Sequence, residues 1–417
     1  MTINLMRNID SLAGRPICFM LSCYETLRGM GCRLMSFFRR QQVLPRPKKI
    51  LFIKLSELGA IIVALPLLKS IREEYPEAEL FFLTFEENRS VFEVLGGIIP
   101  EKNIFTISEN SLGDFLKDTW RRIYQLRGER MDIIFDLEMF SRLSAILSYL
   151  SNAKKRIGFH RYSFEGLYRG NLFTHHVPYN PLNHTFKSYL SFMDGLHLEK
   201  KKRPALTMTI TDDLAVLPAY EPSEKTKQVI AEKLRKFSLH ENTRLILINP
   251  GGGLIPIREW PIENFLFLMK KLLNDSNNHL VIVGSKNTAA KQGLLSFVGN
   301  NERCLSLAGQ TTLPELIALF NISNALITND CGMAHLASLS TVKTFVMFGP
   351  ESPAIFSPLG NNKKIIYAGL PCSPCLSALN HRKSVCKDNK CLQMISPEHV
   401  YAMICDSFKK TGGPGVY

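Results

Sequence analysis

The stretch ALITNDCGMAHLA, residues 325–337, decides the fold of this chain. An apolar strand ends in Thr328, Asn329 and Asp330, and after a glycine turn a helix begins that includes His335. In a parallel α/β sheet, ligands bind at the carboxyl ends of the strands, beside the N-termini of the helices that follow. Asp330 is therefore placed either to hold sugar hydroxyls next to an anionic group or to cap the helix.

The same alternation of apolar strands with helices recurs along the chain, which indicates an α/β fold with parallel sheets. The predicted strands are 50–55, 80–83 and 133–137 in the first half, and 245–249, 280–283, 325–328 and 344–348 in the second. Two such halves predict two Rossmann-like domains that face each other across a central cleft. The expected parts are a basic N-terminal extension at 1–48, a first domain at 49–210, a connecting segment at 211–244, a second domain at 245–395, and a C-terminal helix and tail at 396–417.

The composition excludes some classes of protein. The 417 residues are 45% hydrophobic but contain no run of about eighteen uncharged apolar residues, so we expect no transmembrane helix. The N-terminus lacks the pattern of a secretory signal. A chain of this size does not need disulfides to hold its core, so its ten cysteines favour a reducing compartment.

Half of the net charge of +14 lies in residues 1–49, which hold nine Lys or Arg against Asp10 and Glu25. Apolar side chains recur there at roughly helical spacing, and cations fill other positions. The apolar set is Ile17, Met20, Leu21, Tyr24, Leu27, Leu34 and Phe38, and the cations are Arg28, Arg33, Arg39 and Arg40. The pattern is typical of an amphipathic helix on an anionic membrane, or of an extra helix packed on the main body. Nucleic acid is not an expected partner, because no aromatic–basic platform accompanies the charge.

Two glycine-containing loops of the second half suit a ligand that carries phosphate. The glycines 251–253 follow the strand 245–249, and their backbone N–H groups can approach a ligand closely. Arg258 comes shortly afterwards, and its rigid fork of donors can bind phosphate. A further loop begins at Gly284, after the next strand. Neither loop is a P-loop or a complete dinucleotide fingerprint.

The order and spacing of these and other motifs make the chain resemble the family 9 glycosyltransferases, the ADP-heptose:lipopolysaccharide heptosyltransferases. The resemblance covers roughly residues 48–405. It rests on KLSELG (54–59) with LPLL (65–68), RIGF (156–159), NPGGG (249–253) with REWP (258–261), LAG (307–309) with LPEL (313–316), TNDCGMAHLA (328–337), FGP (348–350) and CSPC (372–375).

The resemblance implies a GT-B architecture, with the acceptor bound by the first domain and a nucleotide-sugar by the second. It implies inverting transfer without a metal or other cofactor, of heptose from ADP-heptose, to a lipopolysaccharide-core or other lipid-linked saccharide. It also implies a cytoplasmic protein, peripheral on the inner face of the bacterial inner membrane. By position, Arg258 corresponds to a residue that contacts the donor phosphates, and Asp330 to one that contacts the sugar and takes part in catalysis. The predicted donor-binding residues are Gly251, Gly252, Gly253, Arg258, Gly284, Asn329, Asp330, Gly332, Met333, Ala334 and His335.

The acceptor side departs from the family pattern. The favoured base of the family is an aspartate that follows the glycine of the first loop, and this chain has Ala60 after Gly59. A methyl group cannot accept a proton. Glu57 in the same loop is the candidate replacement, and Asp136 or Glu138 are alternatives. A protein that binds a nucleotide-sugar or glycolipid without efficient turnover is a further alternative. The expected acceptor-side positions are Ser56, Gly59, Ala60 and Asp136.

Four cysteines near the C-terminus and three histidines of the first half each have more than one possible role. Cys372, Cys375, Cys386 and Cys391 could hold a structural zinc ion, although their spacing departs from common zinc ribbons, and disulfides or free thiols are the alternatives. His175, His176 and His184 lie in a stretch expected to form a polar loop, where they either contact an anionic acceptor or bind no ligand.

Overall fold

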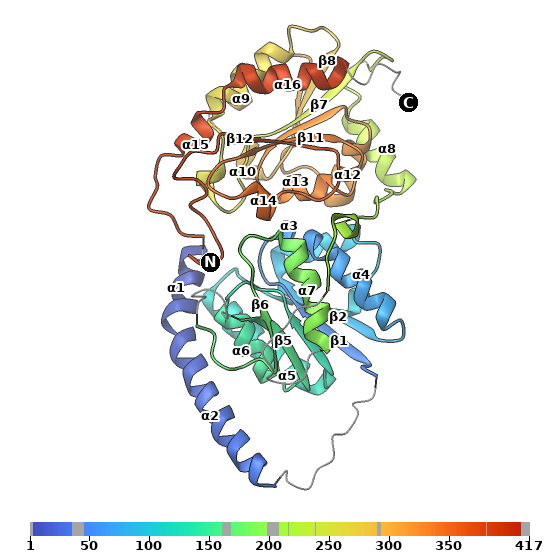
Figure 1. The fold of residues 1–417 in the computed structure, drawn as a ribbon. Helices are drawn as coiled ribbons and strands as arrows, with labels where there is room; N and C mark the ends of the chain where they lie inside the picture. The colour runs from blue at the N-terminus through green and yellow to red at the C-terminus, as the bar shows by residue number, and fades with distance from the viewer. Residues whose placement is uncertain are drawn as a thin grey trace. The chain divides into compact units, whose positions relative to one another are not determined.

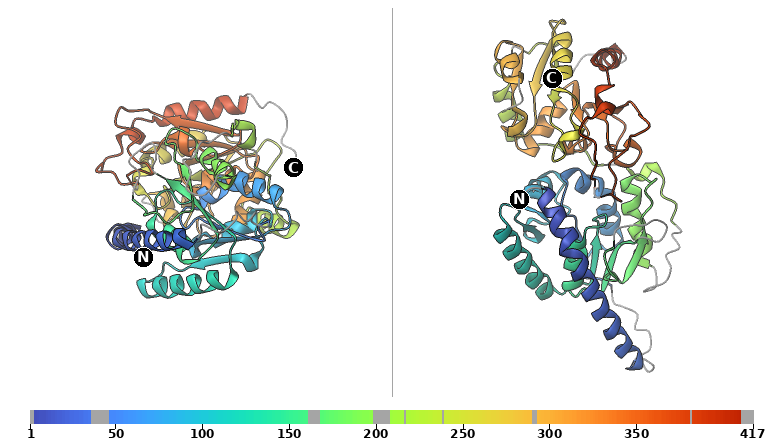
Figure 2. Two further views of the ribbon diagram at one scale, coloured as in Figure 1. Left: turned by 60° about the horizontal axis from the view of Figure 1, so that its bottom comes forward. Right: turned by 90° about the vertical axis from the view of Figure 1, so that its left-hand side faces the viewer.

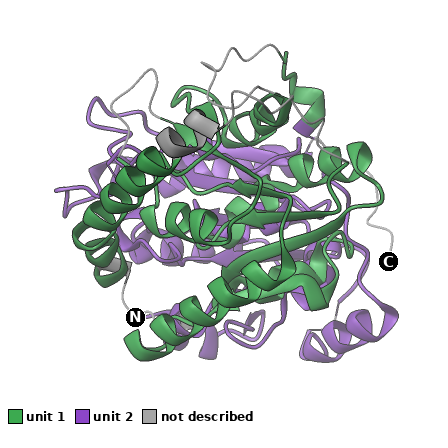
Figure 3. Ribbon diagram, turned by 90° about the horizontal axis from the view of Figure 1, so that it is seen from below, with its two compact units in different colours: residues 1–214 green, residues 215–417 purple. Residues whose placement is uncertain are grey.

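The computed structural model describes residues 3–35, 46–160, 168–197, 208–215, 217–237, 239–289, 293–380 and 382–409, with side chains in the N-terminal part described from Leu5 to Arg28. The chain forms two compact units, unit 1 at 1–214 and unit 2 at 215–417 (Figures 1 and 3). The division between them falls inside the segment 211–244 that the sequence predicts as a connection.

Unit 1 is built on a six-stranded parallel sheet in the order β3-β2-β1-β4-β5-β6. Its strands are β1 (Lys49–Ile53), β2 (Glu79–Phe85), β3 (Ile104–Ile107), β4 (Ile133–Asp136), β5 (Lys155–His160) and β6 (His175–Pro178). The order reverses between β1 and β4, where Ile50 is paired with Ile133. The carboxyl edge at such a reversal is where α/β sheets bind ligands.

Helices cover both faces of this sheet, because its strands are apolar on both sides. They are α3 (Leu58–Val63), α4 (Leu65–Glu74), α5 (Leu112–Glu129), α6 (Arg142–Leu150) and α7 (Thr185–His197), with 3-10 helices η2 (Glu86–Val94), η3 (Glu101–Asn103) and η4 (Asp212–Ala215). The core of the sheet includes a stack in which the ring centroids of Phe52 and Phe135 are 5.3 Å apart. Phe192 of α7 meets the edge of this stack, which fixes that helix on the sheet.

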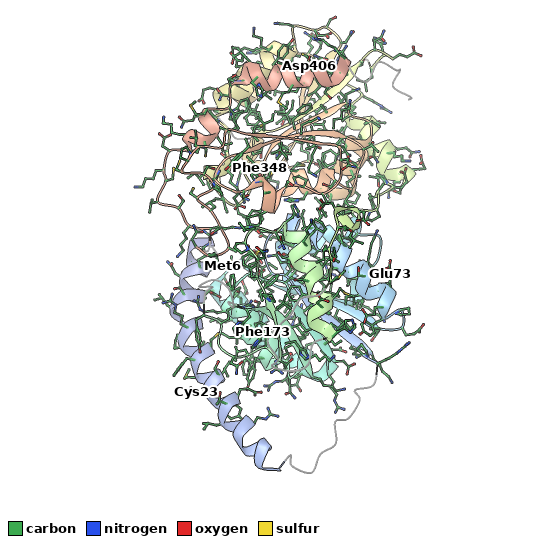
Figure 4. The ribbon with its side chains drawn as sticks, in the orientation of Figure 1. Met6, Cys23, Glu73, Phe173, Phe348 and Asp406 are labelled. Carbon is green, nitrogen blue, oxygen red and sulfur yellow. The ribbon has the colours of Figure 1, made fainter. Side chains whose placement is uncertain are left out.

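The helices α1 (Ile3–Leu12) and α2 (Gly14–Met35) pack on unit 1 along α6, and α2 then extends past the body of the unit (Figures 1 and 2). A carboxylate oxygen of Asp10 accepts the backbone N–H groups of Arg142 at 2.8 Å and Leu143 at 2.9 Å. Asp10 thereby satisfies the first turn of α6 from another helix. Met6, labelled in Figure 4, packs against the core of unit 1.

One side of α2 is buried against unit 1 and the other is exposed. Cys18 is fully buried, and the Ser22 hydroxyl accepts the N–H of Asn171 at 2.8 Å. The packed-helix alternative for this segment is therefore confirmed over these residues, whereas contact with a membrane stays a prediction. Leu34 and Phe38, together with Arg33, Arg39 and Arg40, lie outside the described side chains. The outward large apolar side chains among the described residues of α2 are Phe19, Met20, Tyr24 and Leu27, all exposed by about 60% or more.

Unit 2 repeats the architecture with a parallel sheet in the order β12-β11-β10-β7-β8-β9. Its strands are β7 (Arg244–Asn249), β8 (Asn278–Ile282), β9 (Cys304–Ser306), β10 (Ala325–Asn329), β11 (Lys343–Phe348) and β12 (Lys363–Tyr367). The reversal lies between β7 and β10. Phe348, labelled in Figure 4, ends β11 in a buried cluster with Val346.

The helices of unit 2 follow its strands in sequence, except α8, which precedes β7. They are α8 (Glu224–Lys233), η5 (Pro256–Arg258), α9 (Ile262–Leu272), α10 (Lys286–Ala289), α11 (Leu294–Gly299), α12 (Leu313–Asn321), α13 (Gly332–Ala337), α14 (Pro353–Phe356), α15 (Lys390–Gln393) and α16 (Pro397–Lys409). α9 and α16 lie side by side on one face of the sheet (Figure 1). Trp260 is buried next to Phe265 of α9 and donates its indole N–H to the carbonyl of Ile395 at 3.0 Å.

The predicted α/β fold with two Rossmann-like units is confirmed, and all seven predicted strands are present. The sequence missed five further strands, β3, β5, β6, β9 and β12. The polar loop expected at His175 and His176 is wrong, because both residues lie in β6 at the edge of the sheet. Within the described ranges, no helix is both long enough and apolar enough to span a bilayer.

Candidate functional site

Two asparagines hold the loops at the carboxyl edge of the unit 2 sheet. The side-chain oxygen of Asn329 accepts the backbone N–H of Trp260 at 2.9 Å. Its nitrogen donates to the carbonyls of Pro250 at 3.1 Å and Gly251 at 3.3 Å. Asn249 closes the same loop, because its oxygen accepts the N–H of Gly251 at 3.3 Å. The amide of Asn329 is thus engaged with backbone groups, and its role in this structure is to fix the glycine loop.

The glycines of this edge allow close packing between the loops. A Cβ on Gly252 would lie 2.5 Å from the Cγ of Glu259, and one on Gly284 would lie 2.7 Å from the side-chain oxygen of Asn249. Gly284 has a φ of 129° and Gly253 a φ of 68°, backbone conformations that side chains disfavour. These positions therefore require glycine for the loop geometry itself.

Arg258 is the central cation of this edge. It is buried with only 9% of its surface exposed, and its Nη1 lies 3.8 Å from Asp330 Oδ2 and 3.7 Å from Glu351 Oε1. Among the described residues, neither Arg258 Nε nor Asp330 Oδ2 has a hydrogen-bond partner. Buried polar atoms are normally hydrogen-bonded, so this unused donor and acceptor are available to a ligand.

The carboxyl group of Asp330 has an unusual protonation equilibrium. Burial raises the pKa of Asp330 from its ordinary value of 3.8 to about 6, and the attraction of Arg258 only partly opposes this. The backbone N–H of Asp330 donates to the carbonyl of Met347 at 3.0 Å, which fixes the residue between β10 and β11. The fold thus holds the carboxylate at the sheet edge although its burial is unfavourable for the charged form. Carboxyl groups with such a shifted pKa are common at functional sites.

The short helix α13 begins directly after this carboxylate. Its N-cap is Cys331, which offers no side-chain hydrogen bond to the first turn. Asp330 therefore does not cap the helix, and that alternative from the sequence is wrong. The first N–H groups of a helix have no intrahelical partner, so those at Gly332 and Met333 can face an anion. His335 is buried in the same helix, at 9% exposure.

Three further charged residues belong to this site, Glu351, Arg382 and Glu259, and the sequence motifs did not predict them. Glu351 is almost fully buried, and its Oε1 lies 3.4 Å from the Nε of Arg382 as well as near Arg258. Glu259 accepts the N–H of Gly252 at 3.0 Å. A signal for Glu351 was present, because it directly follows the FGP motif at 348–350.

The corresponding edge of unit 1 contains a buried ion pair. Lys54 Nζ lies 3.0 Å from Glu138 Oε1, and both side chains are nearly inaccessible to solvent. The same oxygen accepts the N–H groups of Leu55 at 2.8 Å and Ser56 at 3.1 Å. Glu138 is therefore committed to holding the first loop, and Ser56 belongs to that loop through its backbone.

Asp136, at the end of β4, lies deeper in the same network. Its side chain is fully buried, pairs with Arg169 and accepts the N–H of Glu138 at 3.0 Å. Burial raises the pKa of Asp136 to about 6, against the attraction of Arg169. The N-cap of the next helix, α6, is Ser141, so Asp136 does not cap that helix.

The predicted base, Glu57, stands in a strained backbone conformation. It is a half-buried residue with a φ of 70° and a ψ of 96°, in the region that favours glycine. Its carbonyl accepts the N–H of Ala60 at 3.0 Å, which starts α3. Gly59 is buried and Ala60 half-buried. Strain of this kind persists where the surroundings enforce it and is frequent at functional sites.

The histidines and cysteines take ordinary positions. His175 shares a 2.8 Å hydrogen bond with Thr174, His176 stacks on His160 at 4.3 Å, and His184 accepts a backbone N–H from the start of α7. The four cysteines are free thiols, Cys372 and Cys386 exposed, Cys375 half-buried and Cys391 buried. The described part of the chain holds no group of three or more His, Cys, Asp or Glu placed to bind a metal ion. The structural zinc ion stays a prediction.

Comparison with protein families gives a match to the model described as glycosyltransferase family 9 (heptosyltransferase) over residues 119–385, which is more than half of the chain. Lipopolysaccharide heptosyltransferase 2 of Salmonella typhimurium is 28% identical over 151 residues, 36% of this chain. The chain spans only 42% of the length of that relative. Lipopolysaccharide core heptosyltransferase OpsX of Haemophilus influenzae is 22% identical over 77% of this chain and 84% of its own length.

Among solved structures, the ADP-heptose lps heptosyltransferase II of E. coli superimposes with a TM-score of 0.63. The superposition covers 88% of this chain and all of the other, at 21% sequence identity. At that identity the match establishes a shared fold, in agreement with the two parallel sheets described above.

Proposed function

The chain belongs to glycosyltransferase family 9, the heptosyltransferases, and we propose that it transfers heptose from ADP-heptose to a lipopolysaccharide-core or other lipid-linked saccharide. The observation that carries this proposal is the buried Arg258 beside Asp330, at the edge where the unit 2 sheet reverses. A buried cation with an unused donor suits a diphosphate, and a carboxylate with an unused acceptor suits a sugar hydroxyl.

In the proposed reaction, an acceptor hydroxyl attacks the anomeric carbon of the donor with inversion. The carbon–oxygen bond to the diphosphate breaks, and ADP leaves with the electron pair of that bond. Arg258 and the first N–H groups of α13 stabilise the negative charge that grows on the leaving group, a role that needs no metal. Asp330 orients the sugar.

A base must take the proton of the acceptor hydroxyl, and we assign that role to Glu57. Two observations support the assignment. The alternatives Asp136 and Glu138 are buried and engaged with Arg169 and Lys54, respectively. Glu57 is on the first loop, and its backbone is held in a strained conformation that a glycine would adopt more easily.

A second candidate function is a homologue that binds the nucleotide-sugar or a glycolipid with little or no turnover. Ala60 favours it, because this position has no group that accepts a proton. Both functions require Arg258 and Asp330 to bind the donor. Only the transferase requires Glu57 as a base.

We further propose that the protein is cytoplasmic and peripheral on the inner face of the bacterial inner membrane. The basic charge of residues 1–49 and the exposed apolar side of α2 support contact with an anionic surface. A deletion of the segment is a poor test, since it also removes Asp10 from α6.

The deciding experiment measures ADP release by the purified full chain with ADP-heptose and a core glycolipid that lacks the heptose. Wild type is compared with Asp330→Ala and Arg258→Met, and ADP binding is measured by calorimetry for each. Turnover by the wild type that both variants lose supports the transferase. Tight ADP binding by the wild type without turnover on any core glycolipid would establish the binding protein instead.

A further inference from the structure

Helix α5 has a row of large apolar side chains that no described residue of unit 1 buries. Leu116, Trp120 and Tyr124 follow one another at four-residue spacing, which places them along one side of the helix. They are 57%, 71% and 81% exposed. The buried side of the same helix packs on the sheet through Phe115 and Leu126, so the fold does not need the exposed row.

A second exposed apolar row lies on α2, and the two rows meet at a cavity. The outward side chains of α2 include Tyr24 and Leu27, at 61% and 68% exposure. The next residue, Arg28, lines the cavity together with Arg127, which lies one turn after Tyr124 on α5. The cavity therefore connects the end of the α2 row with the end of the α5 row within unit 1. We name the two rows and the cavity together the α2–α5 surface.

The cavity has the charge of an anion site. Its volume is about 640 Å³, and its lining residues are Arg28, Arg127, Arg130, Met131, Ser151, Asn152 and Lys154. Four of these are cations and none is acidic. Asp132 neutralises Lys154, so the excess of positive charge in the cavity comes from the three arginines.

Two of the four cations are engaged and two are available. Arg127 donates to the carbonyl of Leu150 at 2.6 Å, and Lys154 to the carboxylate of Asp132 at 2.7 Å, which fixes the floor of the cavity. Arg28 and Arg130 are exposed and make no hydrogen bond or ion pair with another described residue. Their guanidinium groups are therefore available to an anion.

We propose that the α2–α5 surface docks on an anionic lipid bilayer, with a lipid phosphate in the cavity and Trp120 and Tyr124 in the interfacial layer. Tryptophan and tyrosine prefer the region of the headgroups, where the ring is apolar and its polar atom stays hydrated. Arginines beside them add attraction to anionic headgroups. The combination of aromatic rings with a cation-lined cavity is the complement of a lipid headgroup and its upper acyl chain.

The assignment of this docking surface rests on the proposed function in one respect, namely that the acceptor is lipid-linked. It also changes the expected site of membrane contact. The N-terminal segment does not act alone, because half of the surface comes from α5 and the loops after it.

Flotation with vesicles tests the proposal on the full chain. The vesicles are pure phosphatidylcholine, or phosphatidylcholine with about one third phosphatidylglycerol as the anionic lipid. One double variant removes the aromatic row (Trp120→Ser with Tyr124→Ser), and another removes the free cations (Arg28→Gln with Arg130→Gln). Matched controls change exposed residues elsewhere, Leu182→Ser with Leu295→Ser and Lys225→Gln with Lys270→Gln.

The wild type and both controls should float with the anionic vesicles and not with pure phosphatidylcholine. Each test variant should lose at least about tenfold in affinity for the anionic vesicles, with ADP binding unchanged as evidence of intact folding. Anionic-vesicle binding equal to wild type in both test variants would overturn the docking surface alone. A wild type that binds neither kind of vesicle would overturn the membrane contact as well, while ADP release tests the transferase independently of either result.

Discussion

The Nη1 atom of Arg258 lies 3.8 Å from Oδ2 of Asp330, close enough for strong attraction and too far for a direct hydrogen bond. Both side chains are buried, and the pKa of Asp330 is raised to about 6 because burial penalises its charge more than the arginine stabilises it. The pair is therefore kept in a state that costs the folded protein stability. That cost is expected where the two groups serve a ligand that completes their contacts.

Replacement of Asp330 by Asn should stabilise the protein at pH 7.5 and abolish transfer. The folded-state pKa of about 6 exceeds the ordinary 3.8, so the penalty grows as pH rises from 3.8 to about 6 and is full above it. We expect the Tm of Asp330→Asn to rise by a few degrees at pH 7.5, with the gain absent below pH 4. Calorimetry at both pH values checks this. Asp213→Asn, an exposed change, is the control, and a lower Tm for Asp330→Asn at pH 7.5 would contradict the prediction.

Replacement of Arg258 by Met should weaken ADP binding by roughly tenfold or more and reduce kcat by about 10² to 10³. The methionine keeps most of the side-chain volume but loses the charge that stabilises the leaving diphosphate. Calorimetric titration with ADP and steady-state kinetics separate the two effects. Arg235→Met, on an exposed arginine of the same unit, should leave both unchanged.

Glu57→Gln should reduce kcat by about 10² or more while ADP affinity stays at the wild-type value. The amide keeps the shape of the side chain but cannot take the proton. Ala60→Asp should restore part of the rate in the Glu57→Gln background, because it supplies a carboxylate one helical turn along. A rate unaffected by Glu57→Gln would remove Glu57 as the base.

Asp10→Ala should lower the free energy of unfolding by about 2 kcal/mol, because it removes the partner of the α6 N-terminus and leaves the buried Arg142 without its carboxylate. Urea unfolding monitored by circular dichroism measures the change. The exposed Asp406 makes only a 3.5 Å contact with Lys409, so Asp406→Ala is the matched control and should change the midpoint little. A loss equal to that of the control would show that the contacts of Asp10 contribute nothing to stability.

The sequence predicted seven of the eight inner strands and missed all four edge strands together with the inner strand β5. The misses at the edges have a physical reason. β1, β4, β7 and β10 are buried on both faces and appear as continuous apolar runs. By contrast β12 begins with two lysines, and β6 contains His175 and His176. Edge strands are half covered, so their composition resembles that of loops.

Local motifs predicted the residues of the donor-side site. They could not predict which acidic residues surround Arg258. Glu351 lies 93 positions after Arg258 in sequence and within 3.7 Å of it in space, a relation that only the sheet order creates. The strain at Glu57 and the contacts of Asp10 with the first turn of α6 are likewise absent from any local pattern, since each depends on a contact or a φ angle that the fold imposes. The sequence pattern of α2 fits both a membrane helix and a packed helix, because the two sides of the helix differ: Cys18 is buried, whereas Tyr24 is 61% exposed.

The chain contains two tryptophans, and the fold gives one to each unit. Trp120 is 71% exposed on α5, whereas Trp260 is 1% exposed and donates its backbone N–H to the side-chain oxygen of Asn329. Their fluorescence spectra must therefore differ, with red-shifted emission from the hydrated indole and blue-shifted emission from the enclosed one. Single-tryptophan versions of the protein would consequently report lipid contact and nucleotide binding as two separate optical signals, without any added label.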